Sequence, residues 1–258
     1  GADKKVSCTV SRNGDLVGAM ALQYTTTSAA SANTVTTFSE IISSVEVEIG
    51  GQKIDKHYGN WLDIWYGLTE PTKKKSSLLA GDGTLATGRT GFVPLQFWFN
   101  RNAGLALPLI ALQYHEVKLN ITFGDLTPAA SPVSGLKLFV DYIYLDTEER
   151  KRFAQMSHEY LIDQLQFPGD DGAGTKWRLN FNHPVKEIVW VPTNAAVDDT
   201  FKLMLNGHDR FSARPLEYFT VLQKYYHHSA VQNTTTYAND GSDLVDIPAN
   251  DGGDGVCV

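Results

Sequence analysis

The sequence predicts an all-β protein of the sandwich or barrel class that is interrupted by one short helix. Two observations support this class. Apolar and polar residues alternate with period 2 in several stretches, as expected of half-buried strands. Turns rich in glycine, asparagine, aspartate and proline separate these stretches at short intervals. Hydrophobic residues make up 42% of the 258 residues and aromatic residues 11%, which is enough for a sizeable core.

The expected strands follow one another along the chain at residues 44–49, 92–99, 117–123, 136–144, 178–182, 188–191 and 201–205. The clearest is 117–123, where four apolar residues alternate with three polar ones. The aromatic stretch 92–99 is expected to be a more fully buried strand, with Pro94 tolerated near its start. Residues 105–112 are apolar throughout and are expected to cross between these two strands. Asn206-Gly207 is a strong signal for a two-residue hairpin.

The apolar density of residues 92–123 suggests a membrane span, but its uninterrupted length is too short. A spanning helix needs about 20 apolar residues. Here Gln96 and residues 100–102 interrupt the run, and Pro94 and Pro108 add breaks. A buried β core is therefore the better interpretation.

One helix is expected at residues 146–155. Asp146 is followed three residues later by Glu149, the spacing of a capping box. Three basic residues then fall toward the C-terminal half, where the helix dipole favours cations. Because the segment is short and polar, we interpret it as a connector between two domains, residues 1–150 and 151–258.

Composition argues against several classes of function. A net charge of −7 does not suit a protein that grips a nucleic-acid backbone, which needs a basic surface. The one compact basic cluster, residues 73–75, is interpreted as a solvated loop. The two cysteines, Cys8 and Cys257, form no metal framework and do not indicate an oxidising compartment.

No catalytic, cofactor-binding or metal-binding residues are predicted, and the chain is not expected to be an enzyme. The G-x-S-x-G and P-loop motifs are absent, and residues 81–86 resemble a dinucleotide-binding turn only faintly. Glu116, Asp141 and Asp146 are candidate members of a catalytic carboxylate pair, but the sequence does not give the separation between them. The histidines are His57, His115, His158, His183, His208, His227 and His228, and structural roles are favoured for them. The aspartates at 240–243 and 251–254 lack the EF-hand pattern.

Two sequons could accept a glycan. Asn233 is expected in a loop and is the better acceptor. Asn120 is expected on the polar face of a strand, so a glycan there requires an exposed sheet face. Both are held as candidate glycosylation sites.

Several segments carry a resemblance to a known family, and they occur in the family's order. They are residues 4–17 (KKVSCTVSRNGDLV), 45–65 (VEVEIGGQKIDKHYGNWLDIW), 104–119 (GLALPLIALQYHEVKL), 140–167 (VDYIYLDTEERKRFAQMSHEYLIDQLQF), 179–190 (LNFNHPVKEIVW) and 205–211 (LNGHDRF). Together they resemble the major capsid proteins of nucleocytoplasmic large DNA viruses, the phycodnavirus, mimivirus and iridovirus group.

The resemblance implies two consecutive antiparallel jelly rolls joined by the helical connector. It implies a late viral structural protein whose homotrimers form pseudo-hexagonal capsomers that tile the icosahedral capsid of a large dsDNA virus. Its partners would be itself, neighbouring capsomers and minor capsid proteins, without direct nucleic-acid contact, membrane insertion or cofactor. It would be located in the capsid shell of the virion, after assembly in the host cytoplasm.

The sequence also departs from the family's pattern. It lacks segments that family members carry at both ends, so we expect a fragment whose second jelly roll is incomplete. Ala103 stands where the family commonly has proline. The alternative function is a carbohydrate-binding or glycoside-cleaving β sandwich, suggested by the five tryptophans and eleven tyrosines. That alternative loses its main support if Trp61, Trp65 and Trp98 are buried.

Overall fold

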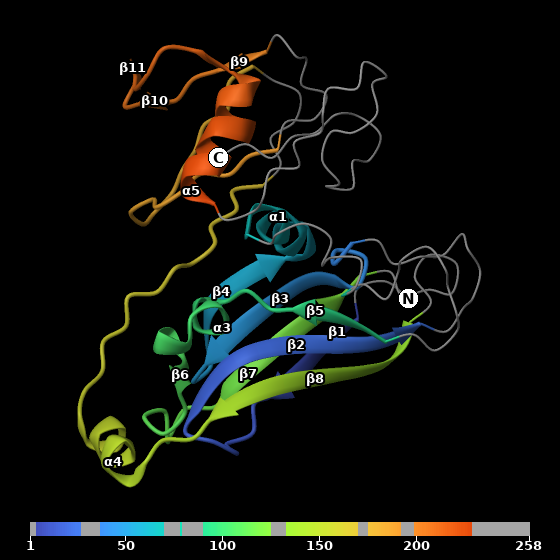
Figure 1. Ribbon diagram of the computed structural model, residues 1–258, viewed down its shortest axis with the longest axis vertical. Helices are drawn as coiled ribbons and strands as arrows, with labels where there is room; N and C mark the ends of the chain where they lie inside the picture. Colours follow the sequence, from blue (N-terminus) through green and yellow to red (C-terminus); the bar gives the residue numbers. More distant parts are fainter. Residues whose placement is uncertain are drawn as a thin grey trace. The chain divides into compact units, whose positions relative to one another are not determined.

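The computed structural model describes residues 4–26, 37–69, 78, 90–124, 133–169, 175–191 and 199–228 (Figure 1). The chain divides into two compact units. The first comprises residues 1–63 and 75–166, and the second comprises residues 64–74 and 167–258. The predicted domain boundary after residue 150 stays a prediction.

The first unit contains a four-stranded sheet, in the order β1-β7-β3-β4. Its strands are β1 (Lys5–Thr9), β7 (Val117–Phe123), β3 (Ile42–Ile49) and β4 (Gln52–Tyr58). All its pairings are antiparallel. The β3–β4 hairpin turns at Gly50 and Gly51, whose φ angles of 59° and 84° are those that glycine adopts without strain.

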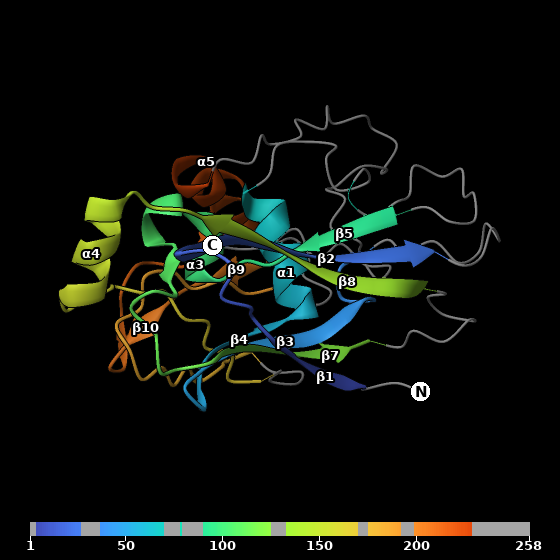
Figure 2. The same cartoon turned by 90° about the horizontal axis from the view of Figure 1, so that it is seen from below.

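A second four-stranded sheet is built around the long strand β2 (Leu16–Thr26). On one side β2 pairs with β5 (Thr90–Pro94) and β6 (Leu107–Pro108), and it also pairs along its length with β8 (Val133–Ile143). These pairings too are antiparallel. Figure 2 shows the two sheets as separate layers, with β8, β2 and β5 in one and β4, β3, β7 and β1 in the other.

The core lies between these two layers. Inward-facing residues of both sheets are fully buried, among them Val45, Leu119, Leu22 and Tyr24. Gly91 lies under the Tyr24 ring, where a Cβ atom would come within 2.3 Å of it. The first unit is therefore an antiparallel β sandwich, as the sequence predicts.

Short helices complete the first unit. They are α3 (Trp98–Arg101), the 3-10 turn η1 (Ala103–Leu105) and α4 (Thr147–Gln155). The helix α1 (Gly59–Thr69) begins in the first unit and ends in the second. Asp63 on α1 accepts hydrogen bonds from the backbone N–H groups of Phe38 and Ser39, at 2.9 and 3.1 Å.

In its described residues, the second unit has little regular structure. It contains the two-residue strands β9 (Thr200–Phe201), β10 (Met204–Leu205), β11 (His208–Asp209) and β12 (Arg214–Pro215), followed by the π-helical turn η2 (Tyr218–Gln223) and α5 (Lys224–His227). The buried ring of Phe219 contacts the rings of Trp190, Phe201 and Phe211. Phe219 is the buried member of this aromatic cluster in the described residues.

Most of the expected elements are present. Residues 117–123 form β7 with strictly alternating burial, and residues 44–49 and 136–143 lie in β3 and β8. Asp146 caps α4 by accepting a hydrogen bond from Glu149 N at 2.8 Å. Asn206 and Gly207 turn the β10–β11 hairpin with φ angles of 52° and 82°, which confirms the predicted turn.

Three expected strands, 92–99, 178–182 and 188–191, do not form as predicted, and the expected strand 201–205 is divided between β9 and β10. The expected strand 92–99 ends at Pro94, and Trp98 begins the helix α3. The side chain of Asn100 causes this change of direction, because its Oδ1 accepts from Phe97 N and its Nδ2 donates to Gly18 O. The expected strands 178–182 and 188–191 do not pair with each other, and within the described residues 175–191 only Trp190 is a bridge residue.

Among the described residues, no helix is long and apolar enough to cross a membrane.

Candidate functional site

The connector between the two expected domains is fixed to the first sandwich through Asp15. This residue is 8% exposed, and its carboxylate accepts hydrogen bonds from Leu145 N and from the Arg150 guanidinium, both at 2.8 Å. The Arg150 hydrogen bond, followed by that of Leu145, lowers the pKa of the Asp15 carboxyl. Asp15 therefore remains ionised at neutral pH and sets the direction in which α4 leaves β8.

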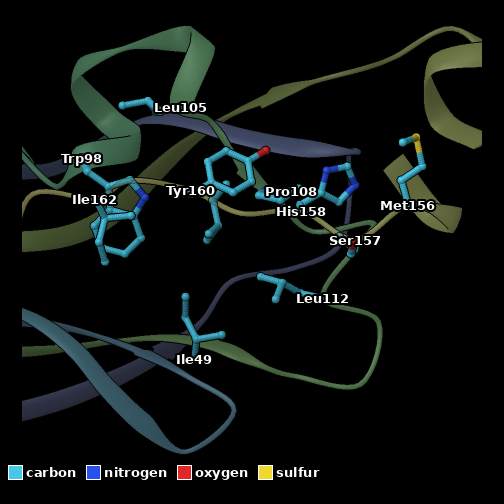
Figure 3. Close-up of a pocket in the computed structure, with 12 residues that line it drawn as sticks. Ile49, Trp98, Leu105, Pro108, Leu112, Met156, Ser157, His158, Tyr160 and Ile162 are labelled. Atoms are coloured by element: carbon cyan, nitrogen blue, oxygen red, sulfur yellow. The ribbon is translucent and has the colours of Figure 1, made fainter. Parts of the chain in front are cut away.

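After α4 the chain runs back along the first unit as an extended segment, residues 156–166, here called the strap. Tyr160 and Ile162 are half-buried and Leu161 between them is exposed, so alternate side chains face the sandwich. Figure 3 shows Tyr160 and Ile162 beside apolar side chains such as Trp98 and Leu105. The strap therefore covers part of an apolar groove on the first sandwich.

That groove retains an open volume of about 340 Å³. The first unit lines it with Ile49, Trp98, Leu105, Leu107, Pro108, Ala111 and Leu112, and the strap adds Met156, Ser157, His158, Tyr160 and Ile162. The lining holds no carboxylate or lysine that could act on a substrate. This chemistry suits packing against apolar side chains.

Polar contacts attach the far end of the strap to β4. Leu165 N donates to Asp55 Oδ1 at 3.1 Å, and Gln164 Nε2 donates to Ile54 O at 2.5 Å. Arg101 and Asp163 form an ion pair at 3.4 Å. Because β4 is an edge strand of its sheet, the strap covers an edge that could otherwise pair with another chain.

Asp55 is the buried centre of this attachment. Its side chain is 1% exposed, and its Oδ1 also accepts from Lys56 N at 2.8 Å. Its Oδ2 lies 2.9 Å from His57 Nε2, which is an ion-pair distance without hydrogen-bond alignment. The His57 ring stacks on Phe97 with centroids 4.4 Å apart. Sequence reasoning missed this pair, although the alternation of Asp55 and His57 in β4 could have placed both on the inner face.

The outer face of the β1-β7-β3-β4 sheet is charged. Glu46 forms ion pairs with Lys53 at 3.1 Å, Lys56 at 3.5 Å and Lys5 at 3.6 Å. Partial burial acts to raise the pKa of Glu46, but the hydrogen bond and charge of Lys53, followed by Lys5 and Lys56, outweigh it and lower that pKa. This face is therefore adapted to water or to polar contacts.

The three candidate catalytic carboxylates have separate surroundings. Glu116 pairs with Lys118 at 2.9 Å, and the Lys118 hydrogen bond lowers the pKa of Glu116, whereas a general acid needs a raised pKa. Asp146 caps α4, and Asp141 is exposed on β8. These surroundings provide no general acid opposite a base.

The histidines are likewise separate. Within the described part of the chain, no group of three or more histidine, cysteine, aspartate or glutamate side chains could hold a metal ion. His158 Nε2 contacts Phe153 O at 2.9 Å, and His228 Nε2 lies 2.5 Å from Glu187 Oε1. Cys8 is a free, half-exposed thiol in β1.

Of the two candidate glycan acceptors, only Asn120 falls in the described residues. It lies in β7, is half-buried, and its Nδ2 donates to Glu48 Oε2 at 3.0 Å. Glycan occupancy stays a prediction at both positions. The features considered at residues 73–75, 81–86, 240–243 and 251–254, together with Asn233 and Cys257, lie outside the described residues.

Comparison with known proteins links this architecture to viral capsids. The family described as "Major capsid protein N-terminus" matches residues 1–146, and "Large eukaryotic DNA virus major capsid protein" matches residues 149–201. The major capsid protein of Pyramimonas orientalis virus is 48% identical, over 93% of this chain and 67% of that protein. That of Phaeocystis pouchetii virus is 38% identical, over 92% of this chain and 58% of that protein.

A third relative links sequence and structure. The major capsid protein of Paramecium bursaria Chlorella virus 1 is 35% identical, over 87% of this chain and 66% of that protein. The solved structure titled "PBCV-1 virus capsid, quasi-atomic model" superposes with a TM-score of 0.74 at 35% identity, covering 87% of this chain and 70% of that one. The chain thus spans between 58% and 67% of the length of these three relatives. The match confirms the predicted double jelly-roll class.

Proposed function

The chain belongs to the major capsid protein family of large eukaryotic DNA viruses, and from this premise we propose that it is part of a structural capsid subunit. Trimers of the subunit would form pseudo-hexagonal capsomers that tile an icosahedral shell. The observation that carries the proposal is the match to capsid families along residues 1–146 and 149–201, together with the superposition on a capsid structure.

The physical character of the first unit supports a structural role. The antiparallel sandwich buries its apolar residues, and its described residues present ion pairs and an apolar groove. Many weak contacts that are repeated by symmetry stabilise a shell without any strong single contact. The subunit would therefore act by complementarity of surfaces and not as an enzyme.

The proposed partners are other copies of the subunit, neighbouring capsomers and minor capsid proteins. The net charge of −7 supports a shell protein without direct contact to the genome. We place the subunit in the virion shell after assembly in the host cytoplasm, made late in infection and without membrane insertion. Residues 1–150 and 151–258 are proposed as the two jelly-roll portions.

Mass measurement in solution on the full-length gene product tests this function. Native mass spectrometry is expected to give a trimer, and electron microscopy of the same sample should show pseudo-hexagonal particles. A stable monomer with glycoside hydrolase activity would overturn the proposal.

The carbohydrate alternative is not supported. Of the three tryptophans on which this alternative depends, Trp98 is buried in the first unit, and Trp61 and Trp65 are half-buried. The relatives are named as capsid proteins.

A further inference from the structure

The sheet edges of the first sandwich are protected unequally. The strap covers β4, and β1 is only 5 residues long. The edge opposite β8 is divided between β5 and β6, and each contains a proline. In contrast, β8 is an 11-residue edge strand without a proline, and in the described part of the chain it pairs only with β2. Residues 137–140 keep a regular register with β2, and the register shifts lie on either side of them, the first next to Gly135 with its φ of 62°. A long uncovered edge is a template for pairing with another chain.

The side chains of β8 form a nearly symmetric pattern about Phe139. Lys137, Phe139 and Asp141 are exposed, and Leu138 and Val140 between them are half-buried. The Phe139 ring contacts that of Phe92 on the outer face of the sheet, with centroids 6.4 Å apart. The described part of the chain offers no ion-pair partner to Lys137 or Asp141.

We propose that β8 pairs in antiparallel orientation with β8 of a second copy of this chain, about a two-fold axis at Phe139. In this register Lys137 lies opposite Asp141 of the second copy, and the same ion pair recurs across the axis. On the inner face Leu138 lies opposite Val140, so half-buried apolar side chains become covered. Phe139 lies opposite its own equivalent. Cross-strand pairs of these kinds stabilise antiparallel sheets.

Charge complementarity selects the second copy as the partner. A charged residue on an edge strand normally discourages pairing. Here the two opposite charges are equidistant from Phe139, so self-pairing in this one register joins unlike charges. Pairing shifted by two residues places Lys137 opposite Phe139 and loses both ion pairs. The contact is isologous, as a two-fold interface requires.

The choice of a second copy also rests on the proposed self-assembly of the subunit. The test uses charge reversal in the full chain, with association measured by sedimentation equilibrium. Lys137→Asp and Asp141→Lys each place like charges opposite each other twice, and each is expected to weaken association on the order of tenfold. The double variant carrying both substitutions restores the unlike pairs and is expected to restore association.

Lys118→Asp is the matched control for Lys137→Asp, because it makes the same substitution on a strand of the other sheet, and it is expected to leave association unchanged. A second measurement locates the contact. In a chain with Cys8→Ser and Cys257→Ser, Phe139→Cys is expected to form an intermolecular disulfide on mild oxidation, because opposed Cβ atoms in antiparallel pairs lie within disulfide reach. Phe92→Cys, on the same outer face but on β5 at the opposite edge of the sheet, is expected to form none.

The results of these experiments distinguish a failure of the β8 pairing from a failure of the proposed capsid function. Weakening by both single reversals, restoration by the double variant and the Phe139→Cys cross-link together support the β8 pairing. If either charge-reversal variant associates as strongly as the wild-type chain, the pairing is overturned and the capsid function is left intact. A wild-type chain that remains monomeric while the full-length product forms trimers also overturns only the pairing. If neither the wild-type chain nor the full-length product associates, the β8 pairing and the proposed capsid function are both overturned.

Discussion

Replacing Asp55 with alanine should release the strap from the first sandwich. The Asp55 carboxylate accepts hydrogen bonds from Leu165 N and Lys56 N and lies 2.9 Å from His57 Nε2, with its side chain 1% exposed. Alanine supplies no acceptor. Three polar groups then lose their partner in a place that water reaches poorly.

The expected cost follows from that burial. Leaving a buried donor without its acceptor costs about 1–3 kcal/mol, and Asp55→Ala leaves the backbone N–H groups of Leu165 and Lys56 in this state. Asp55→Asn keeps an acceptor for Leu165 N and fits the same volume, so a smaller loss is expected. Asp163→Ala is the surface control. It removes an ion pair whose aspartate side chain is 45% exposed, and such pairs contribute about 0–1 kcal/mol.

Amide hydrogen exchange on the full chain measures the effect locally, and urea unfolding measures it globally. Asp55→Ala should accelerate exchange at Leu165 and Gln166 and lower the unfolding midpoint. Asp163→Ala should change the midpoint little. Unchanged exchange at Leu165 in Asp55→Ala would refute the argument that this carboxylate holds the strap.

Three further predictions concern stability and modification. The pKa of Asp15 is lowered in the folded state, so its ionised carboxylate stabilises the fold at neutral pH. The difference in unfolding free energy between the wild-type chain and Asp15→Asn should be fully present at neutral pH and should shrink as the pH falls below about 3.9, the usual pKa of an unperturbed aspartate. Urea unfolding at pH values from about 3 to about 7 checks this. Leu119→Ala should cost about 2–5 kcal/mol by leaving a cavity in the fully buried core, measured in the same assay. Glycopeptide mass spectrometry of virion protein should find more glycan on Asn233 than on Asn120, whose amide is hydrogen-bonded within its sheet.

Local patterns in the sequence were sufficient to predict the parts of the fold that short-range physics controls. The alternation in residues 117–123 places Leu119 inward and Asn120 outward, as observed. The Asp146 cap and the Asn206-Gly207 turn depend on residues within a few positions of each other. Such features are decided by backbone geometry and neighbouring hydrogen bonds, so they can be predicted without a partner.

Contacts between distant segments could not be predicted in this way. Phe97 and Phe99 have the composition of a strand, but the Asn100 side chain bonds to Gly18 O, 82 residues away in sequence, and the chain turns into a helix instead. The strap depends on Leu165 meeting Asp55 across 110 residues. No periodic pattern in residues 156–166 predicts this contact, because the position of an extended segment with few backbone hydrogen bonds is determined by the surface that it covers.

The charge of the chain constrains how copies can meet. Each copy carries −7, so two copies repel at long range, but this repulsion is screened beyond about 8 Å at physiological ionic strength. Association of two copies therefore has to be stabilised by short-range interactions at the contact. The β8 pairing does so, because each Lys137 faces an aspartate and the pair adds no net charge at the interface. Added salt should first strengthen association by screening the long-range repulsion, and at high concentration weaken it by screening the Lys137–Asp141 pairs. Association that rises steadily with salt would indicate that these ion pairs contribute nothing to the contact.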